Sequence, residues 1–281
     1  MVAAMALFVI NDTFVKLAAG HYPTGQLLTL RGFVAVASSL ALVAALGQLH
    51  ALKLLREPRV LLRGLMEGVV AYTFIFALAH MPLANITAIL QAASLFVVAM
   101  AAALGIEQVG WRRWLAVAVG FAGVLLIVRP GIDGFNAYAL IALGSAFVVG
   151  LRDLMTRSIR ANIPSPVIAI GSTLMVMMVG ASMSLAETWQ PVTLRETLYL
   201  ACAGVFVAFG NFSIVVAYRD GDVSVVSALR YSVLIFALML GYVVWGEFPD
   251  RWALAGAALI VGSGLYAMHR ERVRQRGLAG R

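Results

Sequence analysis

Ten apolar segments, each close to the length of a membrane-spanning helix, divide almost the whole chain. They lie at about 1–19, 24–47, 61–80, 83–105, 112–128, 137–156, 166–186, 196–218, 223–246 and 252–268. A helix needs about 20 apolar residues to cross the hydrocarbon core of a bilayer. The pattern therefore predicts an all-α membrane protein with ten transmembrane helices. The connections are very short, as at 80–82 and 218–222, so no extramembrane domain is expected.

The composition supports a polytopic membrane protein, since 62% of the residues are hydrophobic and 12% are charged. Soluble domains have about 45–50% apolar and about 25% charged residues. The net charge of +8 would suit a nucleic-acid partner, but the basic residues lie between apolar runs and in the tail, where they act as topology signals. No nucleic-acid partner is expected. The single cysteine, Cys202, excludes an intrachain disulfide and a cysteine-rich metal cluster.

The distribution of basic residues predicts the orientation. Fourteen lysines and arginines lie on one side of the membrane, in the segments after helices 2, 4, 6 and 8 and in the tail. The other side carries only Arg129, Arg195 and Arg251. By the positive-inside tendency, both termini are predicted to be cytoplasmic in a plasma (bacterial inner) membrane. The apolar first segment lacks a basic leader region, so we expect a retained helix rather than a signal peptide. The four remaining basic residues fall within helices and are Lys16, Arg31, Arg152 and Arg230.

A weak internal repeat runs along the chain at a nearly constant offset. At an offset of 141 residues, NDTFVKLA matches RDLMTRSI, which aligns Asp12 with Asp153 and Lys16 with Arg157. These residues form two acid-to-base pairs at i,i+4, the favourable order on a helix. They are candidate gate residues; plain helix-end salt bridges are the alternative.

The repeat also predicts the domain organisation. At an offset of 140 residues, segment 82–107 matches segment 222–247. The repeating unit therefore holds five helices, and the predicted domains are residues 1–134 and 135–281. Because five is odd, the second unit enters the membrane inverted. Inverted repeats are typical of transporters, with a substrate site near the midplane between them.

Each repeat ends in a long helix, a glutamate, a tryptophan and a glycine-rich last helix. The residues are Glu107, Trp111 and Gly123, then Glu247, Trp252, Gly262 and Gly264. In these features the whole chain resembles the EamA-type members of the drug/metabolite transporter superfamily, and among them the bacterial exporters of aromatic and other amino acids. The resemblance implies a ten-helix basket with a central cavity and alternating access. Relatives commonly have a proline about eleven residues before the glutamate, where this chain has Leu234 and Ser94 or its neighbours.

Arg230 is the strongest candidate for substrate contact. It lies about seven residues, roughly 10 Å, inside the predicted ninth helix. An intramembrane arginine costs at least about 2.5–3.5 kcal/mol on insertion scales, so it almost always faces the protein interior or a wet cavity. Its guanidinium can pair bidentately with a carboxylate. A structural arginine that snorkels to the cytoplasmic surface or pairs with an acid is the alternative.

Polar and aromatic residues of nearby predicted helices complete the expected site. Amides in these positions also join helices by hydrogen bonds, and aromatic rings also face lipid or the core, so both alternatives stay open. The further expected substrate-binding residues are Tyr231, Gln91, Asn85, Tyr72, Phe76, Asn211, Phe209 and Phe212.

The predicted function is a secondary transporter that exports amino acids with bulky apolar or aromatic side chains. Efflux of cationic drugs or transport of another small anionic metabolite is the alternative. An enzyme is not expected, because the chain has no HExxH arrangement and no serine nucleophile elbow. No cofactor or metal is expected; the partners would be a small-molecule substrate and membrane lipid.

Overall fold

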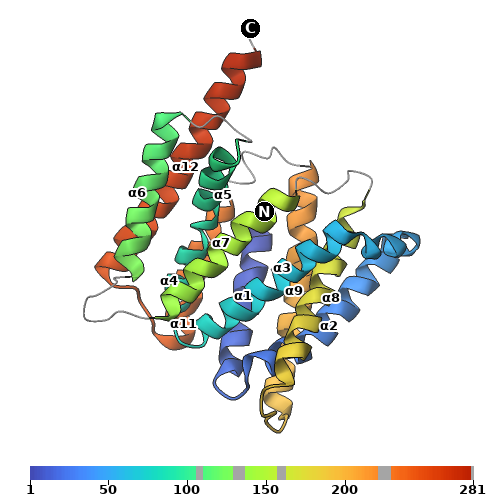
Figure 1. The fold of residues 1–281 in the computed structure, drawn as a ribbon. Helices are drawn as coiled ribbons and strands as arrows, with labels where there is room; N and C mark the ends of the chain where they lie inside the picture. Colours follow the sequence, from blue (N-terminus) through green and yellow to red (C-terminus); the bar gives the residue numbers. More distant parts are fainter. Residues whose placement is uncertain (106–109, 129–136, 157–162, 221–228, 280–281) are drawn as a thin grey trace. The chain divides into compact units, whose positions relative to one another are not determined.

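The computed structural model describes residues 1–281 except 106–109, 129–136, 157–162, 221–228 and 280–281, and all its described secondary structure is helical (Figure 1). The α-helices are α1 Val2–Ala19, α2 Thr24–Ala45, α3 Pro58–Leu78, α4 Leu83–Leu90, α5 Ala93–Ala103, α6 Trp111–Val128, α7 Tyr138–Thr156, α8 Ser165–Ser184, α9 Leu194–Asp220, α11 Val233–Trp245 and α12 Arg251–Ala279. Two 3-10 helices are η1 Leu49–Arg56 and η2 Arg230–Ser232.

The predicted all-α membrane fold is confirmed. Among the described residues, eight helical segments are long and apolar enough to cross a membrane, and two shorter apolar helices cover Trp114–Val128 and Arg230–Trp245. Each of them overlaps one of the segments that the sequence marks, and the count of ten transmembrane helices stays a prediction. The arrangement as two inverted five-helix repeats stays a prediction.

Prolines and glycines explain where several helices begin and end. Pro23, Pro82 and Pro164 precede the first residues of α2, α4 and α8, where a missing backbone N–H costs nothing. Gly246 ends α11 with a φ of +68°, a conformation that favours glycine. After it the backbone N–H of Glu247 bonds the carbonyl of residue 241 at 3.1 Å, which closes the helix end.

The helices form two compact units that do not coincide with the two halves of the sequence. The first unit comprises residues 1–80 and 155–220, and the second comprises residues 81–154 and 221–281. The first contains α1, α2, α3, α8 and α9; the second contains α4, α5, α6, most of α7, α11 and α12. Each unit therefore combines helices from both predicted repeats.

Glycines allow close helix contact in the first unit. A Cβ at Gly180 of α8 would lie 2.5 Å from the Leu28 Cβ of α2. A Cβ at Gly68 of α3 would lie 2.6 Å from a methyl carbon of Val179 on α8. Small residues at such contacts let helix backbones approach in a membrane, where no hydrophobic force drives helices together.

The second unit has the same kind of contact between α6 and α12, which lie side by side (Figure 1). A Cβ at Gly123 would lie 2.7 Å from the Gly256 carbonyl oxygen, and a Cβ at Gly256 would lie 2.5 Å from the Gly123 carbonyl oxygen. Phe96 of α5 packs edge-on against Phe121 of α6 and Phe147 of α7, which joins α7 to this unit.

Candidate functional site

The candidate site in the second unit begins at one interrupted helix and at the short 3-10 helix that precedes α11. The segment expected to form one helix over 83–105 is broken at Gln91 and Ala92, between α4 and α5. The N–H of Ala92 bonds the Ile89 carbonyl at 3.0 Å, so a tighter turn replaces the α-helical pattern. In the other predicted repeat, the 3-10 helix η2 precedes α11.

The break at Gln91 and η2 fall at matching positions, because the 140-residue offset aligns Gln91 with Tyr231 of η2. Neither needs a proline. Broken helices at corresponding positions of two repeats are the places where transporters bind substrates and ions.

A hydrogen bond links α5, next to the break, with η2. The Ser94 hydroxyl donates to the Gln91 carbonyl at 2.9 Å. The Tyr231 hydroxyl therefore donates to the Ser94 oxygen, 3.0 Å away. Tyr231 is 8% exposed whereas Ser94 is exposed, so this bond is only partly buried.

Gly264 of α12 makes room for Tyr231. A Cβ at this position would overlap the tyrosine hydroxyl and ring. The glycine that the sequence marks as part of a repeat signature thus has a local role in seating a candidate site residue.

Asp153 lies between two guanidinium groups of the same unit. Arg152 donates to its Oδ1 at 2.6 Å from Nη2 and at 3.0 Å from Nε. Arg230 approaches Oδ2 at 3.7 Å, too far for a good hydrogen bond. The Arg230 side chain is 37% exposed and the Asp153 side chain 30%. A residue expected at the substrate and a residue expected at a gate therefore interact directly.

Two polar side chains lie at the start of α4: Glu247, which contacts the helix from outside, and Asn85, which belongs to its first turn. Glu247 accepts a long hydrogen bond, 3.4 Å, from the Leu83 N–H, so its carboxylate lies at the positive end of this helix. The Oδ1 atom of Asn85 is buried and has no hydrogen-bond partner among the described residues. A buried acceptor without a partner costs about 1–3 kcal/mol, which suits a group that a ligand or water satisfies.

The other expected substrate residues belong to the first unit. The Tyr72 hydroxyl donates to Glu187 at 3.3 Å, and the Phe76 ring lies 5.4 Å from that of His80. Phe209 is exposed, and Asn211 and Phe212 are half-buried on α9. Of the expected substrate residues, Tyr231 is joined through Ser94 to the turn that contains Gln91, and Arg230 lies near Asp153.

The first unit contains a polar cluster that the sequence analysis missed. Asn11 donates to Asp12 at 2.8 Å and accepts from Nη1 of Arg31 at 3.0 Å. Arg31, on α2, is 7% exposed and also attracts Glu67 of α3 electrostatically. Arg31 lies inside an apolar segment, and this sequence feature, which identified Arg230, could also have identified the cluster.

The candidate gate pairs are described only in part. Lys16 is half-buried one turn after Asp12 on α1. Arg157 lies outside the described residues, so the second pair is represented by Asp153 alone. Within the described ranges, no three histidine, cysteine, aspartate or glutamate side chains gather as a metal site.

Comparisons with known proteins give a consistent family. The model of the EamA-like transporter family matches residues 1–129 and 136–268. The pseudopaline exporter of Pseudomonas aeruginosa is 25% identical over 92% of this chain and 91% of its own. The S-adenosylmethionine uptake transporter of Rickettsia prowazekii is 24% identical over 94% and 89%. The riboflavin transporter of Vibrio cholerae is 25% identical over 93% and 89%.

A solved structure supports the fold. It is described only as the crystal structure of a protein, and it matches with a TM-score of 0.65 at 23% identity. The match covers 97% of this chain and 98% of the other.

Proposed function

The chain belongs to the EamA-like transporter family, and from this premise we propose that it exports amino acids with bulky apolar or aromatic side chains by alternating access. The family and the named relatives are transporters, so the protein is a multi-pass membrane transporter and not an enzyme. The proposal concerns its substrate, its direction and the residues that it uses.

The observation that carries the proposal is the position of Asp153 between Arg152 and Arg230. The close contact belongs to Arg152, at 2.6 Å, and the loose one to Arg230, at 3.7 Å. An incoming carboxylate can replace Asp153 at the half-exposed Arg230 while Arg152 keeps Asp153 neutralised. A guanidinium holds a carboxylate in a planar, two-bonded geometry, so the exchange selects for this group.

The exchange also provides a link to alternating access. A ligand shifts a conformational equilibrium only if it interacts differently with the two states. Arg230 bound to Asp153 and Arg230 bound to substrate are two such arrangements. Because Arg230 directly precedes Tyr231, a movement of Arg230 would be transmitted to the hydrogen bond between Tyr231 and Ser94.

The rest of the substrate would contact groups of both repeats. Gln91 and the unpartnered Asn85 Oδ1 suit a substrate ammonium group or its water. The aromatic residues expected from the sequence would contact an apolar side chain. These are Tyr72, Phe76, Phe209 and Phe212, with Asn211 beside them in sequence.

Efflux of cationic drugs is less well supported. A cationic substrate needs an acid that is not already neutralised, whereas Asp153 contacts two guanidiniums and Asp12 belongs to the Asn11–Arg31 cluster. The pseudopaline exporter supports export as the direction, while the S-adenosylmethionine uptake transporter is a relative with the opposite one.

The test is counterflow in liposomes that contain the purified protein, with labelled phenylalanine, leucine, a sugar phosphate and a lipophilic drug cation. We expect uptake of the two amino acids only, and loss of it in Arg230→Gln. Arg195→Gln is the matched control, because Arg195 is an exposed arginine of the first unit. Counterflow of the cation, or normal amino-acid counterflow in Arg230→Gln, would contradict the proposal.

A further inference from the structure

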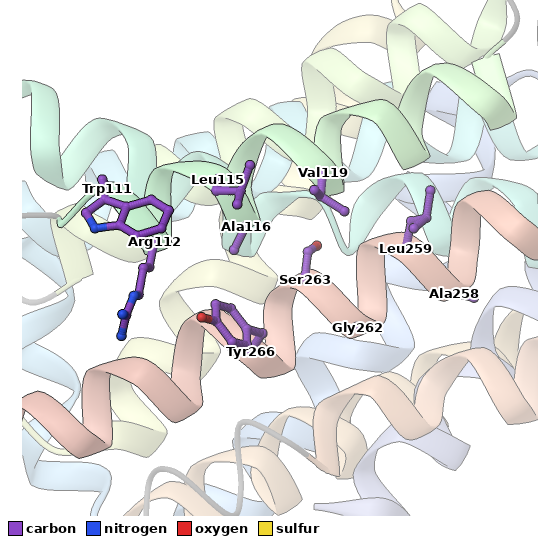
Figure 2. A pocket seen from close by; sticks show the side chains of 10 residues that line it. All are labelled: Trp111, Arg112, Leu115, Ala116, Val119, Ala258, Leu259, Gly262, Ser263 and Tyr266. Atoms are coloured by element: carbon purple, nitrogen blue, oxygen red, sulfur yellow. The ribbon is translucent and has the colours of Figure 1, made fainter.

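An apolar groove runs between α6 and α12 of the second unit (Figure 2). It has a volume of about 370 Å³. Leu115 and Val119 of α6 form one wall, and Gly262 and Tyr266 of α12 lie on the other. Trp111 and Arg112 lie at one end.

Small residues of α12 explain why the groove exists. Beyond the groove along the same helix pair, the backbones of Gly123 on α6 and Gly256 on α12 are in close contact. At Gly262, by contrast, no heavy atom lies within 4 Å of the position that a Cβ would take. The two helices are thus held together at one level and leave open space at another.

The lining of the groove suits a hydrocarbon chain. Leu115 is 57% exposed and Tyr266 45%, although both are large apolar or aromatic side chains. The nearby Ser263 hydroxyl donates to the Ile260 carbonyl at 2.9 Å, so its hydrogen atom is already in use. In a membrane-spanning helix pair, such a surface is covered by lipid rather than water.

Arg112 places a positive charge at one end of the groove. The Arg112 guanidinium lies 5.4 Å from the centre of the Trp111 ring and is exposed. Arg113 follows it in the sequence. Past Tyr266, helix α12 continues to Ala279 and contains Arg270, Arg272, Arg274 and Arg276. Tryptophan and tyrosine are enriched where a membrane meets water, which is the level of a lipid headgroup.

We propose that this groove is a binding site for an anionic phospholipid, with one acyl chain along Leu115, Val119 and Gly262 and the phosphate at Arg112. Basic pockets between transmembrane helices bind anionic headgroups in this way. In the predicted topology, the lipid belongs to the cytoplasmic leaflet. The site is separate from the proposed substrate site and does not depend on the substrate.

Charge favours a lipid over a second copy of the chain. A twofold dimer in the membrane would bring the same patch of both copies together at the same depth. The Arg112 end of one groove would then face that of the other, and the like charges would repel each other.

The test uses the full-length protein in vesicles that contain phosphatidylglycerol or phosphatidylcholine with brominated acyl chains, which quench tryptophan at short range. The Trp111 signal is obtained as the difference from Trp111→Phe. We expect stronger quenching by the anionic lipid, and a loss of about fivefold in relative affinity in Arg112→Gln, the effect of one basic residue near a membrane surface. Gly262→Leu should remove the quenching by both lipids.

Arg251→Gln is the matched control. Arg251 lies over Trp252 at 5.5 Å, the same pairing as Arg112 with Trp111, but neither residue lines this groove. The Arg251→Gln variant should leave the preference for the anionic lipid unchanged. Equal quenching by the two lipids, or an equal effect of the two arginine variants, would overturn the proposal. So would disulfide formation between copies through Leu115→Cys in a Cys202→Ser background.

Discussion

The hydroxyl of Tyr231 lies 3.0 Å from the hydroxyl of Ser94, and this hydrogen bond joins η2 to the start of α5, two segments that match each other in the predicted repeats. Because the Ser94 proton is used on the Gln91 carbonyl, the tyrosine is the donor. A movement of α5 relative to η2 must break or move this bond. The bond is thus suited to report whether these two segments move together.

Gly264→Ala should displace Tyr231 and impair transport. The added methyl group would overlap the tyrosine hydroxyl, and overpacking of this kind typically costs about 1–3 kcal/mol. Thermal unfolding in detergent and amino-acid counterflow measure the two effects. Gly262→Ala, on the same helix but facing open space, should change neither. Equal behaviour of the two variants would show that Tyr231 needs no such room.

Asp153→Asn should tighten substrate binding while slowing turnover. The change removes the carboxylate that competes for Arg230, and for a partly exposed pair this is an effect of up to about 1 kcal/mol, or about fivefold. Equilibrium binding of labelled phenylalanine and single-turnover transport separate the two steps. Weaker binding in this variant would mean that Asp153 supports the substrate rather than competing with it.

The candidate gates should respond in opposite directions. Neutralisation of Asp153 should favour the inward-open state, and neutralisation of Asp12 the outward-open state, since inverted repeats exchange conformations. The side from which a cysteine introduced at Gln91 reacts with a membrane-impermeant reagent, in a Cys202→Ser background, reports both shifts. A shift in the same direction for both variants, or no shift, would make these pairs simple helix-end contacts.

Gln26→Leu should lower the stability of the first unit by about 1–3 kcal/mol. Gln26 is fully buried; its side-chain amide donates to the Gln190 carbonyl at 2.8 Å and its oxygen accepts from the Gln190 N–H at 2.9 Å. The substitution leaves two backbone groups without partners. Gln190→Ala should be nearly neutral, because only its backbone takes part. The apparent unfolding temperature of both variants provides the comparison.

The sequence predicted the membrane fold well because its signal is strong and local. Every expected segment is apolar over about the length of a bilayer, and Pro23 and Pro82 mark where helices begin. The interruption at Gln91 was not predicted. An apolar run looks the same whether it forms one helix or two short ones, and no proline marks the break.

The partners of charged residues were harder to predict than the residues themselves. Arg230 was identified from its depth in an apolar run, but its approach to Asp153 connects segments that are far apart in the sequence. Arg31 gives the same sequence signal and was not selected; its contact with Asn11 also depends on how two helices pack. Helical spacing within one segment predicts neighbours at i,i+4 and nothing about such pairs.

The division of the chain into two units has a consequence for its biosynthesis. Helices α1, α2 and α3 are made first, but they pack with α8 and α9, which are synthesised more than 80 residues later. Gly32 of α2 and Gly68 of α3 lie against α8. These two helix faces therefore have no packing partner in the bilayer until α8 has been synthesised and inserted. A chain cut after residue 134 would complete neither unit. Two fragments expressed together, covering residues 1–134 and 135–281, would supply every helix of both.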